Sequence, residues 1–143
     1  MRRLRRPWLD RLVVPYTTAG NHGGLWVALG VVSGRPVRVA ATVWGTLGVN
    51  YAVKLAVRRE RPVAADSLIA LPSSSSFPSS HAAMSVAAAI ALSRARPRLT
   101  PLWAGMAAAM CLSRVYVGAH HASDVAAGAA LGAVTGSILA GPR

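Results

Sequence analysis

Three short segments, far apart in the chain, carry the residue types that could do chemistry. They are residues 54–62, with the pattern Lys-x6-Arg-Pro, residues 78–81, with the sequence Pro-Ser-Ser-His, and residues 113–124, with the pattern Ser-Arg-x5-His-x3-Asp. Phosphoryl transfer needs fixed cations, because charge spreads over the three equatorial oxygens of the moving group. It also needs a nucleophile and a proton donor, which histidine can supply. Together the three segments predict a phosphoryl-transfer site.

The cations of this site are predicted to be Lys54, Arg61 and Arg114. Arginine suits the task because its planar guanidinium donates two parallel hydrogen bonds to a phosphate. Two further arginines, Arg58 and Arg59, fit no position of the three patterns and are interpreted as anchors at the end of an apolar run.

The predicted nucleophile is His120, because a neutral imidazole nitrogen attacks phosphorus readily at neutral pH. Asp124 lies four residues further on. This spacing puts both side chains on one face if the helix begins early enough, and the carboxylate could then accept a hydrogen bond from the second ring nitrogen and select the tautomer. The spacing favours His120 over its neighbour His121.

The predicted general acid is His81, which follows Ser79 and Ser80 at the start of an expected helix. The two serines could cap that helix, and their backbone N–H groups could point at a phosphate oxygen. An imidazolium at this place could protonate a leaving alkoxide. His22 is interpreted as a helix-start residue and not as a substrate contact.

The three segments resemble the signatures of the type 2 phosphatidic acid phosphatase superfamily, which also includes the vanadium haloperoxidases. The resemblance implies a metal-independent phosphatase with a helical-bundle core and no cofactor. It assigns phosphate binding to Lys54, Arg61, Ser79, Ser80 and Arg114, the acid to His81, the nucleophile to His120 and the orienting carboxylate to Asp124. Ser80 departs from the pattern, because the family usually has glycine there, and the added hydroxyl would crowd the phosphate slightly or donate to it.

The elements that must position these residues are apolar helices. Of the 143 residues, 53% are hydrophobic, and the mean hydropathy of +0.41 exceeds that of an ordinary soluble domain. The length fits a single domain, 1–143. The fold is predicted to be all-α, a polytopic membrane bundle with about five transmembrane helices, at residues 21–33, 37–58, 80–93, 101–115 and 123–140.

An amphipathic helix is predicted at residues 1–15, ending at Pro15, because apolar residues at fourfold spacing alternate with arginines. Such a helix lies in the membrane interface. The long connection, residues 59–79, and the connection between the last two spans fall on the same side of the bundle. The candidate residues should therefore meet at one membrane face. The N-terminal arginines favour the cytoplasmic face of the cell membrane for the site, whereas the arginines of the opposite connections, such as Arg35 and Arg94, would favour the external face. We favour the cytoplasmic face.

The formal charge of +12 could suggest a nucleic-acid partner, but the arginines cluster at the ends of apolar runs, where they would face lipid headgroups. Cys111 is the single cysteine and forms no intrachain disulfide. A glycine stripe, Gly128, Gly132 and Gly136, is interpreted as close packing against another helix of the same chain. A dimer seam is the alternative that we do not favour.

The expected substrate is a membrane lipid phosphate, with polyprenyl phosphates or diphosphates, phosphatidate and phosphatidylglycerol phosphate as candidates. The short, Ala- and Arg-rich five-span form, with Gly20-Asn21-His22-Gly23 ahead of the first span, is similar to actinobacterial members proposed to dephosphorylate decaprenylphosphoryl-5-phosphoribose. This lipid is therefore the leading hypothesis. Two functions of other classes stay open at this point: a haloperoxidase that binds vanadate in place of phosphate, and a membrane scaffold without catalysis.

Overall fold

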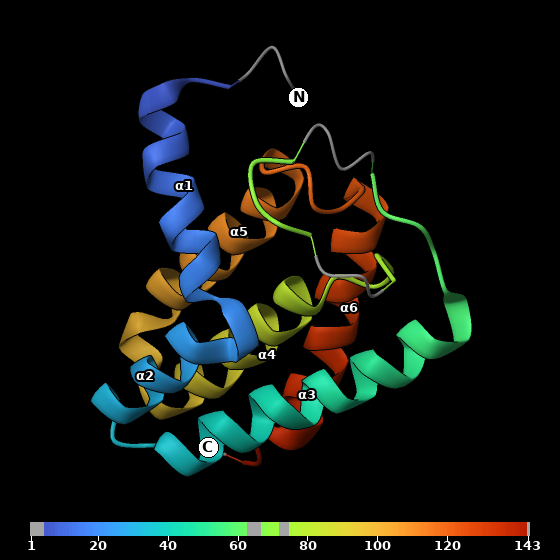
Figure 1. The fold of residues 1–143 in the computed structure, drawn as a ribbon. Helices are drawn as coiled ribbons and strands as arrows, with labels where there is room; N and C mark the ends of the chain where they lie inside the picture. The colour runs from blue at the N-terminus through green and yellow to red at the C-terminus, as the bar shows by residue number, and fades with distance from the viewer. Residues whose placement is uncertain (1–4, 63–66, 72–74, 143) are drawn as a thin grey trace.

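The fold is a bundle of helices without strands over the residues that the computed structural model describes, 5–62, 67–71 and 75–142. Parts of the predicted segments, residues 1–4 of the N-terminal helix and residues 63–66 and 72–74 of the long connection, lie outside this description. The helices, in chain order (Figure 1), are α1 (Pro7–Ala19), the 3-10 turn η2 (Asn21–Gly23), α2 (Gly24–Val32), α3 (Pro36–Val57), α4 (Ser80–Ala95), the 3-10 turn η4 (Pro97–Leu99), α5 (Thr100–Tyr116) and α6 (Ala122–Leu139).

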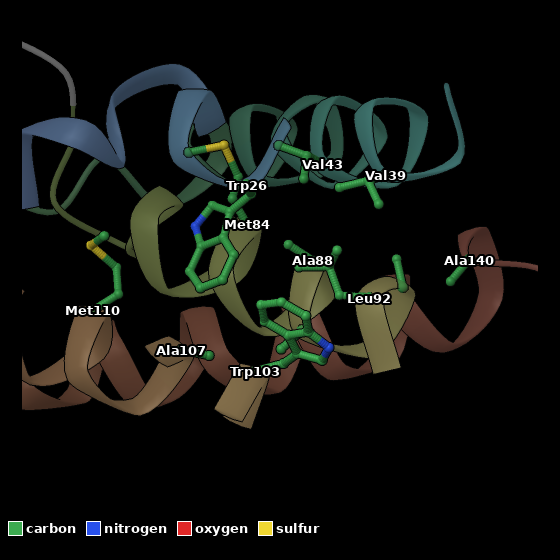
Figure 2. Close-up of a cluster of buried hydrophobic side chains, with 12 residues drawn as sticks. Trp26, Val39, Val43, Met84, Ala88, Leu92, Trp103, Ala107, Met110 and Ala140 are labelled. Atoms are coloured by element: carbon green, nitrogen blue, oxygen red, sulfur yellow. The ribbon is translucent and has the colours of Figure 1, made fainter. Parts of the chain in front are cut away.

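Helix α4 is the centre of the bundle, and α3, α5 and α6 pack around it (Figure 1). Nine of its 16 residues are buried, and most of these are alanines. A helix that is apolar on all sides belongs inside a core, and small side chains let its neighbours approach closely. Trp26 of α2 and Trp103 of α5 add the large side chains of this core, together with Leu92 of α4 (Figure 2).

The glycine stripe of α6 packs against α4, as the sequence predicts. A Cβ atom on Gly128 or Gly132 would collide with the backbone of Ser79 or Ala83, and one on Gly136 would lie 2.7 Å from Cα of Ala87. The stripe is therefore filled from within the chain.

Gly132→Val is expected to unfold or severely destabilise the bundle, by roughly 3 kcal/mol or more, because the added side chain overlaps backbone that has nowhere to move. The thermal midpoint of the purified protein in detergent measures this. Gly48→Val, on α3, is the matched control, because a Cβ there meets nothing within 4 Å. Equal midpoints for the two variants would contradict the packing.

The first predicted span differs most from the structure. Residues 21–33 form the turn η2 and a nine-residue helix α2, which at 1.5 Å per residue is about 14 Å long and too short to cross a bilayer alone. The helix is interrupted because His22 and Gly23 adopt positive φ angles of 53° and 80°. In the described part of the chain, α6 is the one helix long and apolar enough to span a membrane by length and composition, with a mean hydropathy of 1.4.

The N-terminal helix also extends beyond its predicted end at Pro15: α1 continues to Ala19. Hydrogen bonds along its length hold it against α5. Among them, the Tyr16 hydroxyl donates to the Met106 carbonyl at 2.6 Å, and the Tyr116 hydroxyl donates to Asp10 at 2.6 Å. The N-terminal end of α1 and the connections that carry the candidate residues lie at the same end of the bundle (Figure 1).

Candidate active site

The last turn of α3 supplies Lys54, which is buried, with 5% of its surface exposed. Its Nζ donates to the Ser75 carbonyl at 2.6 Å. Arg58 is the C-cap residue of this helix, and its φ of 48° ends the helical conformation after Val57. The connection then brings Arg61 to the same place, and its Nη2 lies 3.5 Å from the Ser75 carbonyl. Two cations thus converge on one carbonyl.

Helix α5 supplies Arg114 from its last turn, also buried, with 3% exposed. Its Nη1 donates to the Thr17 hydroxyl of α1 at 2.6 Å, and Ser113 donates to the same hydroxyl at 3.0 Å. The Nε of Arg114 has no hydrogen-bond partner among the described residues. Leaving a buried guanidinium N–H unpaired is costly, and an anionic ligand would satisfy it.

His120 lies in the connection between α5 and α6 and is buried, with 4% exposed. Its Nδ1 is 2.8 Å from the Ser76 carbonyl, and its Nε2 is 3.3 Å from Nη1 of Arg61. A carbonyl only accepts and a guanidinium only donates, so Nδ1 must carry the hydrogen and Nε2 the lone pair. The ring is therefore the neutral tautomer in which Nε2 is unprotonated and faces Arg61.

Burial lowers the pKa of His120 from 6.5 to about 2, and the charges of Arg114, Arg61 and Lys54 add to the effect. Burial also lowers the pKa of Arg61, partly offset by Asp124. Arg61 stays cationic because arginine is protonated far above neutral pH. At neutral pH the site thus holds a neutral imidazole among fixed positive charges.

This lowered pKa predicts an acid-sensitive fold. Below pH 6.5 the unfolded chain binds a proton at His120 that the folded chain does not, so the stability that the neutral ring contributes falls as pH falls from 6.5 towards 2. His120→Gln is expected to recover about 1–2 kcal/mol of that loss at pH 5 relative to pH 7.5. Thermal midpoints of both proteins at the two pH values measure it. A mutant that loses as much stability as the wild type on acidification would contradict the lowered pKa.

The orientation of His120 is a correction to the sequence prediction. The carbonyl of Ser76 accepts the hydrogen of Nδ1, whereas Oδ2 of Asp124 is 3.8 Å from that nitrogen. The two residues do not share a helical face, because α6 begins only at Ala122. Asp124 is wholly buried, and its Oδ2 accepts the N–H of His121 at 2.9 Å, which caps the helix.

Arg59, which the sequence leaves as an anchor, is the charged partner of Asp124, with Nη1 2.8 Å from Oδ1. The same nitrogen donates to the Ser123 hydroxyl at 2.8 Å. The carboxylate therefore ties the long connection to the start of α6. The backbone carbonyl of Asp124 also accepts a hydrogen bond from the Ser79 N–H at 2.9 Å, so Asp124 holds the start of α4 as well.

Arg59→Gln is expected to lower the free energy of unfolding by about 1–3 kcal/mol, because the buried carboxylate of Asp124 loses a charged hydrogen bond. Denaturation of the purified protein measures this. Arg58→Gln is the control, since the Arg58 Nε donates to the carbonyl of Leu55 in its own helix at 3.1 Å, and about 0.5 kcal/mol or less is expected there. Equal losses in the two variants would argue against the pair.

The segment 78–81 makes only some of the contacts predicted for it, namely a helix cap and groups that face a phosphate. Ser79 is buried, and its hydroxyl accepts from the N–H of Ala82 at 3.5 Å as a helix cap, so neither its amide nor its hydroxyl faces the cavity described below. The Ser80 hydroxyl donates to Oδ1 of Asn50 at 2.7 Å. His81 lies with Nε2 3.0 Å from Oδ1 of Asn21.

A cavity of about 430 Å³ lies between these groups. It brings together the three predicted cations and both predicted catalytic histidines. Its lining is Asn21, His22, Leu47, Tyr51, Lys54, Arg61, Ala70, Leu71, Ser80, His81, Met84, Arg114 and His120. Among the described residues, no group of three or more His, Cys, Asp or Glu side chains lies close enough to hold a metal ion.

Several residues that hold or line this site were not predicted from the sequence, among them Thr17, Asn21, Asn50, Arg59 and Ser76. Asn50 carried a signal, because it is a polar residue one turn before Lys54 in an apolar run. The backbone carbonyl of Ser76 carried none, because its role depends only on where the chain passes.

The chain belongs to the PAP2 superfamily, which its residues 35–140 match. The decaprenylphosphoryl-5-phosphoribose phosphatase of Mycobacterium tuberculosis is 44% identical over 91 residues, covering 61% of this chain and 49% of that protein. The phosphatase of the same name from Mycolicibacterium smegmatis is 34% identical over 119 residues, covering 76% and 65%. The chain therefore spans about half the length of the first relative and about two thirds of the second.

Solved structures support the same fold. The transmembrane PAP2-type phosphatidylglycerolphosphate phosphatase of Bacillus subtilis superposes with a TM-score of 0.82 at 23% identity, covering 95% of this chain and 77% of that one. LpxE of Aquifex aeolicus gives a TM-score of 0.80 at 22% identity, covering 95% and 87%. At this identity the likeness establishes the helical architecture.

Proposed function

We propose that the protein is a lipid phosphate phosphatase that works through a phosphohistidine at His120 and needs no metal ion. The observation that carries the proposal is the unprotonated Nε2 of a neutral, buried His120, 3.3 Å from Nη1 of Arg61 in a cavity that Lys54 and Arg114 also line. A phosphate dianion in this cavity would meet three cations and a nucleophile at once. Membership of the PAP2 superfamily supports the same chemistry.

In the first step, the phosphate is held by Lys54, Arg61 and Arg114. The lone pair of His120 Nε2 attacks phosphorus, and the bond from phosphorus to the leaving oxygen breaks. The electron pair stays on that oxygen, which takes a proton from His81. The phosphorylated ring carries a positive charge, which the Ser76 carbonyl on Nδ1 and the carboxylate of Asp124 at 3.8 Å would stabilise.

In the second step, neutral His81 removes a proton from water, and the water oxygen attacks phosphorus. The bond to Nε2 breaks, its electron pair returns to the ring, and inorganic phosphate is released. The histidine pair is thus restored. Fixed cations serve both transition states, because positioned charge is the main source of catalysis in phosphoryl transfer.

The proposed substrate is decaprenylphosphoryl-5-phosphoribose, the lipid in the name of the two mycobacterial relatives. Undecaprenyl diphosphate, phosphatidate and phosphatidylglycerol phosphate are the alternatives. The chain's own residues that bear on this choice line the cavity next to His81 and are described in the next subsection.

We also propose a location in the cell membrane, with α3, α4, α5 and α6 as crossings, α1 and α2 together as a broken fifth, and the site at the cytoplasmic face. Large apolar side chains that are exposed on the bundle surface support this, because contact with lipid would cover them: Val32, Val37, Trp44, Leu55, Leu112 and Ile138. A single cysteine at Glu60 in a Cys111→Ala background should react with an impermeant thiol reagent only from the cytoplasmic side. Labelling from outside would refute this orientation.

Phosphate release from a panel of lipid phosphates, with and without a chelator, tests the function. Release from a lipid phosphate that survives chelation, and that His120→Ala abolishes, is the expected result. Release that requires added metal would contradict the mechanism. Halide oxidation in the presence of vanadate, without phosphate release, would instead favour a haloperoxidase.

A further inference from the structure

The turn between α1 and α2, residues 20–23, contributes to the lining of the cavity. It lies outside residues 35–140, the region that matches the superfamily. Asn21 and His22 both line the cavity and are exposed. The phosphoryl-transfer steps above use neither of them. Two polar side chains on the wall of a substrate cavity therefore lack an assigned purpose.

The turn is held in one conformation by its flanking residues. A Cβ on Gly20 would lie 2.7 Å from Cε of Met110 and 3.2 Å from Cδ2 of His81, and one on Gly23 would collide with Val43. Gly23 also has a φ of 80°, which favours glycine. The Trp44 indole donates to the carbonyl of His22 at 3.2 Å. Close packing on both sides makes the turn a fixed platform.

The position of Asn21 defines which part of a substrate it can reach. Its Oδ1 is 3.0 Å from Nε2 of His81, and the ring of His81 also hydrogen-bonds the backbone of Thr17. The oxygen that leaves phosphorus must come within hydrogen-bond reach of His81 to be protonated. In an in-line displacement the leaving oxygen departs opposite the attacking His120. A leaving group that reaches His81 would therefore lie beside Asn21.

We propose that Asn21 and His22 form a subsite for the hydroxyl groups of a polyhydroxylated leaving group, such as a sugar. An amide and an imidazole both donate and accept, which matches hydroxyl and ring oxygens. A diacylglycerol or prenyl leaving group has no free hydroxyl and would instead place ester or hydrocarbon groups against these polar atoms. The subsite rests on the proposed function and narrows it to lipids whose phosphate is carried by a sugar headgroup.

The test compares two lipids in the same nanodiscs: a polyprenyl-phosphoryl-5-phosphoribose and phosphatidate. Both release a primary alkoxide that needs a proton, so any misplacement of His81 lowers both rates. Only the first has hydroxyls on the leaving group that can reach the subsite. Asn21→Ala is expected to lower kcat/KM about tenfold on the sugar phosphate, and clearly less on phosphatidate. Thr18→Ala, exposed on α1 and bonded to the Val14 carbonyl of its own helix, is the control.

A binding measurement removes the dependence on turnover. In a His120→Gln background, the affinity for ribose 5-phosphate should fall when Asn21 is replaced by alanine, while that for inorganic phosphate should not. Equal losses on both lipids, or on both soluble ligands, would reduce Asn21 to a positioning residue for His81 and overturn the subsite. No loss on either would overturn it too. A wild-type protein inactive on every lipid phosphate would instead refute the proposed function itself.

Discussion

Replacing His120 with alanine is expected to lower phosphate release by about ten-thousand-fold or more, because the covalent route then has no nucleophile. The binding cations remain, so substrate affinity should change far less than kcat. The measurement is kcat and KM for phosphate release from the best lipid substrate in detergent micelles. The loss of activity is expected at His120 because its unprotonated Nε2 faces Arg61.

The neighbouring histidine provides the control. His121 is exposed and precedes the first turn of α6, and His121→Ala is expected to retain activity within about threefold, as for a surface position with at most a capping role. A mutant at 120 that still turns over, or one at 121 that does not, would mean that the wrong ring was chosen.

Replacing His81 with alanine is expected to lower turnover of an alkyl phosphate by roughly a hundred- to ten-thousand-fold. The reason is that a primary alkoxide leaves poorly without a proton. An aryl phosphate such as 4-nitrophenyl phosphate has a stable leaving phenolate, so its first step should survive the mutation. The second step should not, because His81 also activates the water.

The distinctive result is therefore a burst. With 4-nitrophenyl phosphate, His81→Ala should release about one nitrophenol per enzyme rapidly and then turn over slowly, which stopped-flow absorbance measures. Equal loss in the burst phase for aryl and alkyl substrates would show that His81 is not the acid.

The three segments of the candidate site were predictable because they are short, ordered patterns of rare residue types. Lys54, Arg61, His81, Arg114 and His120 do line one cavity. The reason is simple: the ends of α3 and α5 and the start of α4 must meet when antiparallel helices pack on a common core. The packing of the Gly128 stripe was also predictable, because closely spaced glycines favour close helix contact.

Other features depend on the three-dimensional path of the chain. The hydrogen bond from His120 goes to a backbone carbonyl, which has no side-chain signature in the sequence. Arg59 pairs with Asp124 across 65 positions, and no local pattern connects them. The start of α2 differs from the prediction for another reason. Gly23 and Gly24 disfavour a helix and marked the beginning of this span as uncertain, but the left-handed conformation of His22 has no signature in the sequence.

The candidate site contains several buried charged side chains, whose partners determine the charge of the cavity. Two buried cations of the cavity have neutral partners: Lys54 donates to the Ser75 carbonyl, and Arg114 donates to the Thr17 hydroxyl. The carboxylate of Asp124 pairs with Arg59. The described residues that line the cavity include three cations and no carboxylate, and a phosphate dianion would neutralise this positive charge.

The most direct test of the central claim is to trap the covalent intermediate. His81→Ala should be mixed with 4-nitrophenyl phosphate, quenched in alkali to preserve phosphohistidine, digested and sequenced by mass spectrometry. The phosphohistidine mechanism predicts one phosphoryl group on His120 and none in His81→Ala/His120→Gln. A phosphoryl group on another residue, or a full burst of nitrophenol with no phosphorylated enzyme, would contradict it.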